Sequence, residues 1–265
     1  MQLAGKTVLL TGDSGGIGRA IATRLAQAGA QLRMVGRDAG RLEQVRRALP
    51  GTHQSVVADI NTAAGRDGLF SRCQEDGLDV LVNAAGVQDF QMFDRQDSRH
   101  IEQMLMTNLV APVLLCHRLI PLMQQRQQAI LINVGSIFGS IGHPGFAAYC
   151  ASKFGLRGFT EALQRELAHS PIRVLYLAPR ATDTPFNSAA VMALNRALGN
   201  RTDSPERVAT ELMKMLSDKP RQRFMGWPEN AFVRLNGLFP GIVHHALVKK
   251  LPLIRQHAAN HEQES

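Results

Sequence analysis

The stretch "KTVLLTGDSGGIG", Lys6 to Gly18, joins a short aliphatic run to a turn rich in glycine. Gly12, Gly16 and Gly18 follow the run at the spacing G-x-x-x-G-x-G, and a segment of helical period begins at Ile17. Side chains at these glycines would keep the backbone N–H groups and the helix N-terminus away from a bound diphosphate. The general dinucleotide pattern G-x-G-x-x-G is not met, and a purely structural turn is the alternative. The position of the turn after a first strand nevertheless favours cofactor binding.

The alternation of aliphatic runs and helical segments continues along the chain. Helices are expected at residues 17–28, 41–49, 65–75, 98–123 and 147–168, and the runs between them include "QLRMVG", "LDVLVN", "AILINVGS" and "IRVLYLAP". Strands that are nearly continuous apolar runs, each followed by a helix, are typical of a parallel sheet covered on both faces. We therefore predict a doubly wound, Rossmann-like α/β fold, with its ligand beyond the carboxyl ends of the strands.

The composition limits the class of protein. Aromatic residues are only 5% of the chain and no run interleaves them with cations, so the net charge of +8 does not indicate nucleic-acid binding. Three widely spaced cysteines without a CxxC pair or a His/Cys cluster predict reduced thiols and no metal site. Met1 to Lys6 lacks the pattern of a signal peptide, and no apolar stretch approaches the ~18 residues of a membrane span. We therefore expect a cytosolic protein.

Tyr149 and Lys153 lie four residues apart in "YCASKFG", within a segment that suits a helix. Side chains at this spacing are neighbours on a helical surface, so the phenol and the ammonium could change each other's acidity. This pair alone would fit a plain surface helix just as well. Its interpretation therefore depends on the other motifs of the chain.

Several motifs occur in one order: "TGDSGGIG", Asp59 after the third strand, "NAAG" at residues 83–86, Asn108 in a long helix, and Ser136 thirteen residues before Tyr149. In this order and spacing, residues 5–208 resemble the short-chain dehydrogenase/reductase family, of the type with Thr-Gly-x-x-x-Gly-x-Gly and Tyr-x-x-x-Lys motifs. The resemblance implies an enzyme that transfers hydride between a nicotinamide cofactor and a carbonyl or secondary alcohol.

The resemblance also implies roles for four residues. Tyr149 would be the general acid, giving its phenolic proton to the carbonyl oxygen. Lys153 would lower the phenol pKa and bind the nicotinamide ribose, and Ser136 would hold the substrate oxygen. Asn108 would position a water that links Lys153 to solvent. Relatives commonly form homo-oligomers, dimers or tetramers, through the two long helices that bear Asn108 and Tyr149.

The expected cofactor site gathers residues from the loops that follow the strands. It comprises Gly12, Ser14, Gly16, Ile17, Gly18, Arg37, Asp59, Asn83, Ala84, Gly86, Tyr149, Lys153, Pro179 and Thr184.

The end of the second strand favours NADP(H) over NAD(H). Gly36 occupies the position at which an acid would bind the ribose hydroxyls, and the guanidinium of Arg37 beside it suits a 2′-phosphate. Arg41 could share that phosphate. Asp38 could instead serve the ribose if the strand were one or two residues longer. Asp59 is expected at the adenine edge, although "DINT" would equally form a helix N-cap.

Two positions depart from the family pattern. Arg180 stands after the sixth strand where glycine is usual, and Ala84 stands where a second asparagine is common. Arg180 would contact an anionic group of the cofactor or substrate, or else form a salt bridge with Asp183 or another loop acid. Ala84 is expected to change little.

The substrate side indicates an apolar molecule. Phe138, His143, Phe146 and Phe186 flank the catalytic residues and could line a pocket, with His143 as a loop residue rather than a catalyst. We expect a catalytic domain at residues 1–227, in which residues 182–200 form a flap over the substrate.

Residues 228–265 form a basic, amphipathic C-terminal extension. From Lys219 to Asn260 the chain has seven lysines and arginines against one acid, Glu229. Such a segment could lie on an anionic membrane surface, or form helices packed on its own domain or a neighbouring subunit.

We therefore predict an NADP(H)-dependent oxidoreductase that reduces a carbonyl, or oxidises the matching alcohol, in an apolar or lipid-like substrate. A 3-oxoacyl-thioester reductase is the narrower enzymatic alternative. A non-catalytic NADP-binding sensor or scaffold is the alternative from another class, which the presence of Tyr149, Lys153 and Ser136 disfavours.

Overall fold

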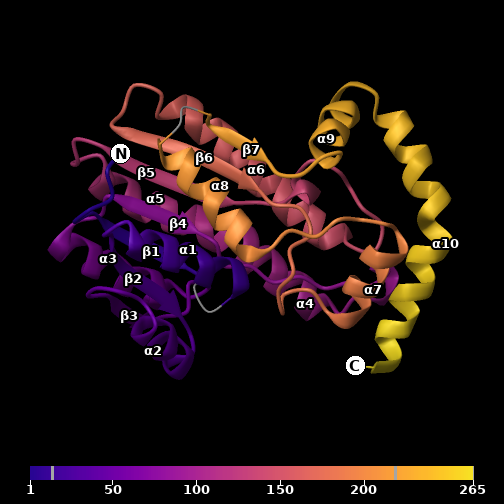
Figure 1. Ribbon diagram of the computed structural model, residues 1–265, viewed down its shortest axis with the longest axis horizontal. Coiled ribbons are helices and arrows are strands. Elements are labelled where there is room, and N and C mark those ends of the chain that lie inside the picture. Colours follow the sequence, from indigo (N-terminus) through magenta and orange to yellow (C-terminus); the bar gives the residue numbers. More distant parts are fainter. Residues whose placement is uncertain (13–14, 218–219, 265) are drawn as a thin grey trace.

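A computed structural model describes residues 1–12, 15–217 and 220–264, with side chains as far as residue 259. Within these residues, seven strands form one parallel sheet in the order β3-β2-β1-β4-β5-β6-β7 (Figure 1). This confirms the predicted doubly wound α/β fold. The strands are β1 (Thr7–Thr11), β2 (Gln31–Gly36), β3 (Gln54–Val57), β4 (Val80–Asn83), β5 (Ala129–Val134), β6 (Ile172–Ala178) and β7 (Gln222–Phe224).

Helices cover both faces of the sheet and its carboxyl end. They are α1 (Gly16–Gln27), α2 (Ala39–Arg47), α3 (Ala63–Asp76), α4 (Ser98–Leu105), α5 (Ala111–Met123), α6 (Ala147–Glu166), α7 (Ala189–Ala197), α8 (Pro205–Ser217), α9 (Glu229–Leu238) and α10 (Pro240–Glu264). Short helical turns are η1 (Phe93–Arg95), η2 (Met106–Val110) and η3 (Ile137–Gly139). The expected helices are present, with ends that differ from the predicted ones by one to two residues.

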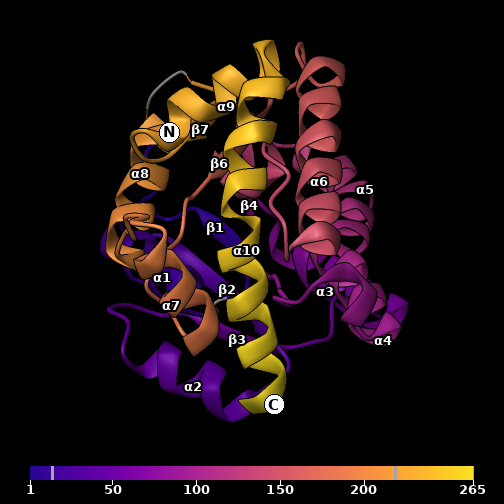
Figure 2. The ribbon, with the colours of Figure 1, turned by 90° about the vertical axis from the view of Figure 1, so that its right-hand side faces the viewer.

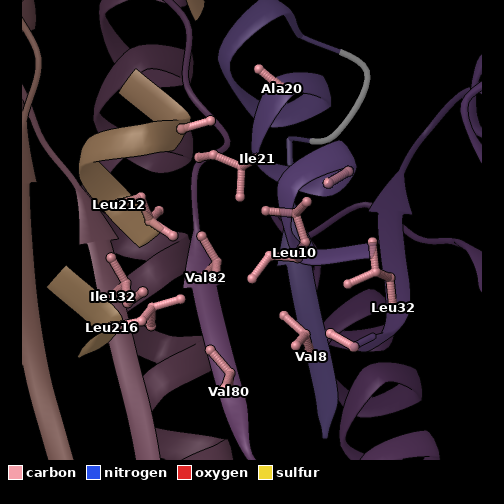
Figure 3. Close-up of a cluster of buried hydrophobic side chains, with 14 of the residues drawn as sticks. Val8, Leu10, Ala20, Ile21, Leu32, Val80, Val82, Ile132, Leu212 and Leu216 are labelled. Carbon is pink, nitrogen blue, oxygen red and sulfur yellow. The ribbon is translucent and has the colours of Figure 1, made fainter. Parts of the chain in front are cut away.

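The alternation of side chains along each strand separates two cores. Val8 and Leu10 of β1 pack with α1, α2 and α8, whereas Leu9 between them packs with α3, α5 and α6. Figure 3 shows the first of these cores, where Ile21 of α1 and Leu212 of α8 meet the side chains of β1 and β4. Because both faces of the central strands are buried, these strands are apolar at nearly every position.

The strand order reverses between β1 and β4. β1 pairs with β2 on one side and with β4 on the other, so the connections that leave β1 and β4 diverge. A crevice opens at such a switch point beyond the carboxyl ends of the strands. Gly12 follows β1, Ala84 follows β4 and Ser136 follows β5, so site residues from distant segments meet at one edge of the sheet.

The expected long helix at residues 98–123 consists of α4, the π-helical turn η2 and α5. It has 26 residues and an 18-residue window of mean hydropathy 1.5, which makes it the one described helix long and apolar enough to cross a membrane and corrects the expectation that no stretch approached that length. Isolated polar residues such as Thr107 interrupt the apolar run without lowering its mean hydropathy much. Because the stretch packs against α3 and α6 and Asn108 at its centre is buried, we interpret it as a core helix.

The C-terminal extension folds onto its own chain. α10 packs against α7 and α9 and runs beyond the carboxyl ends of the strands (Figures 1 and 2). Ile254 and Ala258 are buried with Phe90 and Phe146 of the main domain. Of the two expectations for this segment, the structure shows helices packed on their own domain. The predicted boundary between residues 227 and 228 stays a prediction.

If α10 is an integral part of the fold, Ile254→Ala should lower the free energy of unfolding by about 2–5 kcal/mol, the usual cost of emptying a buried aliphatic site. Ile254 is 0% exposed, whereas Val248 on the same helix is 48% exposed. Val248→Ala is therefore the matched control, with an expected change within about 0.5 kcal/mol. Urea unfolding of both variants measures the difference, and equal losses would contradict the packing of α10.

Candidate active site

The glycine-rich turn after β1 packs too closely for side chains. Gly12 has φ of +79°, and a Cβ there would lie 2.6 Å from the backbone of Ala85. A Cβ at Gly16 would lie 2.4 Å from Cγ2 of Thr184. The neighbouring loop is held by Thr11, whose Oγ1 accepts hydrogen bonds from the backbone N–H groups of residues 84 and 85 at 3.2 and 3.3 Å. The N-terminus of α1 thus meets the loop after β4 at close range.

A cavity of about 260 Å³ lies over this turn. It brings together most of the predicted cofactor residues: Gly12, Gly16, Ile17, Gly18, Arg37, Asp59, Ala84, Gly86, Tyr149, Lys153 and Thr184. A cavity bounded by glycine backbone and a helix N-terminus suits a dinucleotide diphosphate, because the N–H groups and the helix dipole favour negative charge there. The residues present therefore fit a nicotinamide dinucleotide.

Two predicted cofactor residues, Asn83 and Pro179, do not line this cavity. Asn83 is buried in the sheet, where its Nδ2 donates to Oδ1 of Asn133 at 2.9 Å, so its amide supports the strands rather than lining the cavity. Pro179 lines a larger neighbouring cavity. Ser14 lies outside the described residues.

The acidic side chain that follows β2, where the adenosine of a cofactor would lie, is engaged in a local hydrogen bond. β2 ends at Gly36, and Asp38 is the N-cap of α2, accepting from the backbone N–H of Arg41 at 3.0 Å. Arg41 also lies against Asp38, 3.5 Å from Nε to Oδ2. Arg37 is exposed and has no ion pair within the described part of the chain. The second strand thus leaves a free guanidinium and not a free acid beside the cavity.

Asp59 lines the cavity and its Oδ1 accepts from the backbone N–H of Asn61 at 2.9 Å. The N-cap of α3 is Thr62, whose side chain accepts from the backbone N–H of Gly65, so the N-cap expected within "DINT" is present. The expected contact of Asp59 with the adenine edge stays a prediction.

Three of the four predicted catalytic residues meet where β5 ends and α6 begins. Tyr149 and Lys153 lie one turn apart on α6, with Lys153 Nζ 5.8 Å from the centroid of the Tyr149 ring. Lys153 Nζ donates to the carbonyl of Val134 at 3.2 Å. Ser136 follows β5, and its Oγ accepts from the N–H of Phe138 at 3.1 Å.

Burial governs the acidity of this group of residues. It raises the pKa of the Tyr149 phenol above its usual range, and a hydrogen bond with Ser136 opposes the rise. Burial also lowers the pKa of the Lys153 ammonium to about 8. Desolvation is the largest cause acting on the phenol, and the expected lowering of its pKa by Lys153 stays a prediction. A phenol of raised pKa keeps its proton at neutral pH and can donate it.

Asn108 lies in the π-helical turn η2, a local widening that often marks a functional site. Its Nδ2 donates to the carbonyl of Val87 at 2.8 Å and to Ser152 Oγ at 3.1 Å, and its Oδ1 accepts from the N–H of Val87 at 2.8 Å. A Cβ at Gly86 would lie 3.2 Å from Asn108 Oδ1 and 3.7 Å from Lys153 Nζ. Asn108 thus fixes the loop under Lys153; its expected role in holding a water stays a prediction.

A second cavity, of about 540 Å³, opens on the other side of Tyr149. Phe138, His143, Phe146 and Phe186 all line it, as predicted. The rings of Phe138 and His143 stack with their centroids 4.9 Å apart. Burial is the main cause that lowers the pKa of His143, and its Nδ1 contacts the carbonyl of Pro144 at 2.8 Å, so the imidazole behaves as a neutral wall residue.

The opposite wall comes from the predicted flap and from the C-terminal extension, and the sequence connected only the flap with the site. Flap residues contribute Val191, Leu194 and Leu198, and the C-terminal extension contributes Phe232, Val243 and Leu247, with Trp227 just before it. The amphipathic pattern of the extension was visible in the sequence. Its partner could not be identified there, because an apolar face does not specify which surface covers it.

Arg180 bridges the two parts of this wall. Its guanidinium forms ion pairs with Asp203 at 2.8 Å and Glu229 at 3.0 Å, and its side chain is only 7% exposed. The salt-bridge alternative is thus the one observed, with these two acids as partners rather than Asp183. Gly226 makes room for it, since a Cβ there would lie 2.7 Å from Cδ of Arg180.

Comparison with known proteins gives one family. A family model described as short chain dehydrogenase matches residues 6–194. A 3-oxoacyl-(acyl-carrier-protein) reductase of Bos taurus is 35% identical over 179 residues, which cover 66% of this chain and 74% of the relative. A metagenomic short-chain oxidoreductase, solved in complex with NADP, is 26% identical with a TM-score of 0.73 and covers 85% of this chain and 98% of its own.

A short chain dehydrogenase/reductase of Burkholderia phymatum, solved in complex with NAD, has a TM-score of 0.82 at 21% identity and covers 91% of this chain and 96% of its own. At that identity the likeness shows the fold alone. Residues 195–265, which supply much of the wall opposite Phe138, lie outside the family match.

Loss of the Tyr149 hydroxyl should remove the proton donor. Tyr149→Phe should lower kcat for reduction of a test ketone by about 10²–10⁴-fold while cofactor affinity changes little. Tyr176→Phe removes the hydroxyl of the chain's other tyrosine, which is buried behind Gly135, and should keep most of the activity. Steady-state kinetics and a cofactor titration measure both quantities, and retention of most of kcat in Tyr149→Phe would contradict the assignment.

Proposed function

Because this chain belongs to the short-chain dehydrogenase family and is therefore an oxidoreductase, we propose that it reduces the carbonyl of a largely apolar substrate with NADPH, or oxidises the matching secondary alcohol with NADP. One observation carries the proposal: Tyr149 lines both cavities, the polar one over the glycine-rich turn and the apolar one beyond it. A proton donor at this junction faces a cofactor on one side and a substrate on the other.

Each candidate catalytic residue has a separate role at the substrate carbonyl. A nicotinamide held in the smaller cavity would supply hydride to the carbonyl carbon. The hydroxyls of Ser136 and Tyr149 hold the carbonyl oxygen, and Tyr149 transfers its proton to that oxygen as negative charge develops there. Lys153 is protonated below pH about 8, and its charge stabilises the phenolate that remains. The apolar walls exclude water during the transfer.

The preference for NADP rests on the end of β2. Arg37 offers a guanidinium without an internal partner, while the carboxylate of Asp38 caps α2. A guanidinium pairs with a phosphate through charge-assisted hydrogen bonds, and a free acid at this position would instead repel it. The solved relatives named above were complexed with NADP in one case and NAD in the other, so the choice for this chain depends on its own residues.

A 3-oxoacyl-thioester reductase is the second candidate, favoured by the name of the Bos taurus relative. The flap and the C-terminal extension build a wall over the larger cavity. This wall favours a broader specificity for apolar substrates over the narrower thioester specificity. A panel of long-chain ketones and 3-oxoacyl thioesters with NADPH tests both. A non-catalytic NADP-binding sensor would consume no cofactor against any member of the panel.

Two finer expectations on partners are also proposed. Leu114 on α5 and Phe154 on α6 leave apolar surface exposed, which supports a homo-oligomer, dimer or tetramer, through these helices. Sedimentation at micromolar concentration tests this, and a monomer would contradict it.

The protein is proposed to be cytosolic, with the outer face of α9 and α10 touching an anionic membrane. Leu238, Phe239 and Ile242 are exposed on that face, near the cation Lys249.

Arg37→Ala should weaken binding of NADPH by about 1.5–3 kcal/mol, the worth of a hydrogen bond to a charged group, and change NADH binding little. Arg47→Ala is the matched control, since Arg47 is exposed on α2 but paired with Glu43. Fluorescence titration with both cofactors measures the affinities. Equal weakening for NADPH and NADH, or a wild-type preference for NADH, would refute the cofactor assignment.

Contact with a membrane should appear as binding to vesicles that contain anionic lipid, and added salt should weaken it by screening. Leu238→Ser together with Phe239→Ser should reduce co-sedimentation with the vesicles. Val57→Ser, which changes an equally exposed apolar residue on β3, should not. Absence of binding by the wild type at low salt would exclude this contact.

A further inference from the structure

The larger cavity carries two cations that the chain does not neutralise. Its ionisable lining residues besides Tyr149 and the neutral His143 are Arg180, Glu229, Arg201 and Lys250. Arg180 and Glu229 are paired with each other, and Arg180 also with Asp203. Arg201 and Lys250 form no ion pair among residues whose side chains the structure describes. The cavity therefore combines apolar walls with an excess of positive charge at its rim.

Lys250 is directed toward the cavity and not merely toward solvent. It lies on the face of α10 that also presents Val243 and Leu247 to the cavity. Its charge acts on His143, whose ring stacks on Phe138 at 4.9 Å beside Tyr149. An ammonium whose alkyl stem follows an apolar wall keeps its charged end at the water boundary, where it can meet a ligand.

Arg201 reaches the same rim from another element. It follows α7, whose residues Val191 and Leu194 line the cavity together with the C-cap Leu198, and α7 packs against α10 (Figure 2). No acid occurs between residues 230 and 259, so the one acid on α9 or on the part of α10 with described side chains is Glu229, which is paired with Arg180. The two cations thus border one apolar cavity from two sides.

We propose that the substrate is an amphipathic anion, whose apolar chain fills the larger cavity and whose carboxylate or phosphate binds Lys250 and Arg201. The proposal names a substrate class for the reductase, so it rests on the function proposed above. A cavity of about 540 Å³ lies within the ~300–1,000 Å³ range of small-molecule pockets. Such a cavity orients a ligand that has one charged end. The ligand's apolar chain is favoured only in the interior, and its anionic end is favoured only beside the two cations.

The chain contains a probe for binding that does not depend on turnover. Trp227 is the only tryptophan, and it lines the same cavity. Its fluorescence should report binding of dodecanoate, dodecyl phosphate and dodecanol, which share an apolar chain and differ in their polar end. All three are used below the concentrations at which they self-assemble.

Either anion should bind to the wild-type protein about tenfold more tightly than dodecanol, a factor that corresponds to ~1.4 kcal/mol. Lys250→Gln should remove most of that preference, and Arg201→Gln should reduce it. Lys249→Gln removes the adjacent charge, which does not line the cavity, and should keep the preference. The anion that binds more tightly identifies whether the charged end is a carboxylate or a phosphate.

Equal binding of dodecanol and both anions would overturn the inference, and so would equal losses in Lys249→Gln and Lys250→Gln. Turnover of a long-chain oxo acid and its methyl ester with NADPH separates this failure from that of the proposed function. If both ketones are reduced equally, the anionic substrate is wrong and the reductase stands. If neither is reduced while the anion preference holds, the reductase is wrong and the anion site stands.

Discussion

The burial of Lys153 at the carboxyl end of the sheet is the constraint on which the site depends. Placing an ammonium there is unfavourable, and it shifts the pKa of that group to about 8. The carbonyl of Val134 accepts from it, and Gly86 lacks the side chain that would crowd Asn108 beside it. Asn108 holds the loop of Gly86 through the widened turn η2. Strand, loop and helix are thus arranged around one charge, and the phenol of Tyr149 is held beside it.

The second organising contact is the ion-pair group of Arg180. It joins the segment after β6 to Asp203 in the loop before α8 and to Glu229 at the start of α9. Because the guanidinium is almost fully buried, both acids are needed to offset its desolvation. The group holds the flap and the C-terminal extension at the substrate cavity, and these two segments set the shape and charge of that cavity. The candidate catalytic groups and much of the wall of the larger cavity are therefore supplied by different parts of the chain.

The candidate site was predictable from the sequence where a motif fixes backbone geometry. The glycine turn, Ser136, Tyr149 and Lys153 follow from spacing, and the structure brings them to one edge of the sheet. Predictions failed where a side chain had a choice of partners. Asn83 bonds to Asn133 across two strands instead of lining the cofactor cavity. The acidity of Tyr149 also could not be predicted, because desolvation depends on every neighbour.

The sequence by itself determined the doubly wound sheet, because buried parallel strands leave continuous apolar runs, and its motifs predicted the candidate catalytic groups through the family resemblance. Only the tertiary structure decided what the amphipathic extension covers. An apolar helix face is equally satisfied by a membrane, another subunit or its own domain, and nothing in its periodicity distinguishes these surfaces. In the folded chain Ile254 is buried with Phe90 and Phe146, which places Lys250 at the rim of the substrate cavity. That position depends on packing between residues far apart in the sequence, so no local pattern could have indicated it.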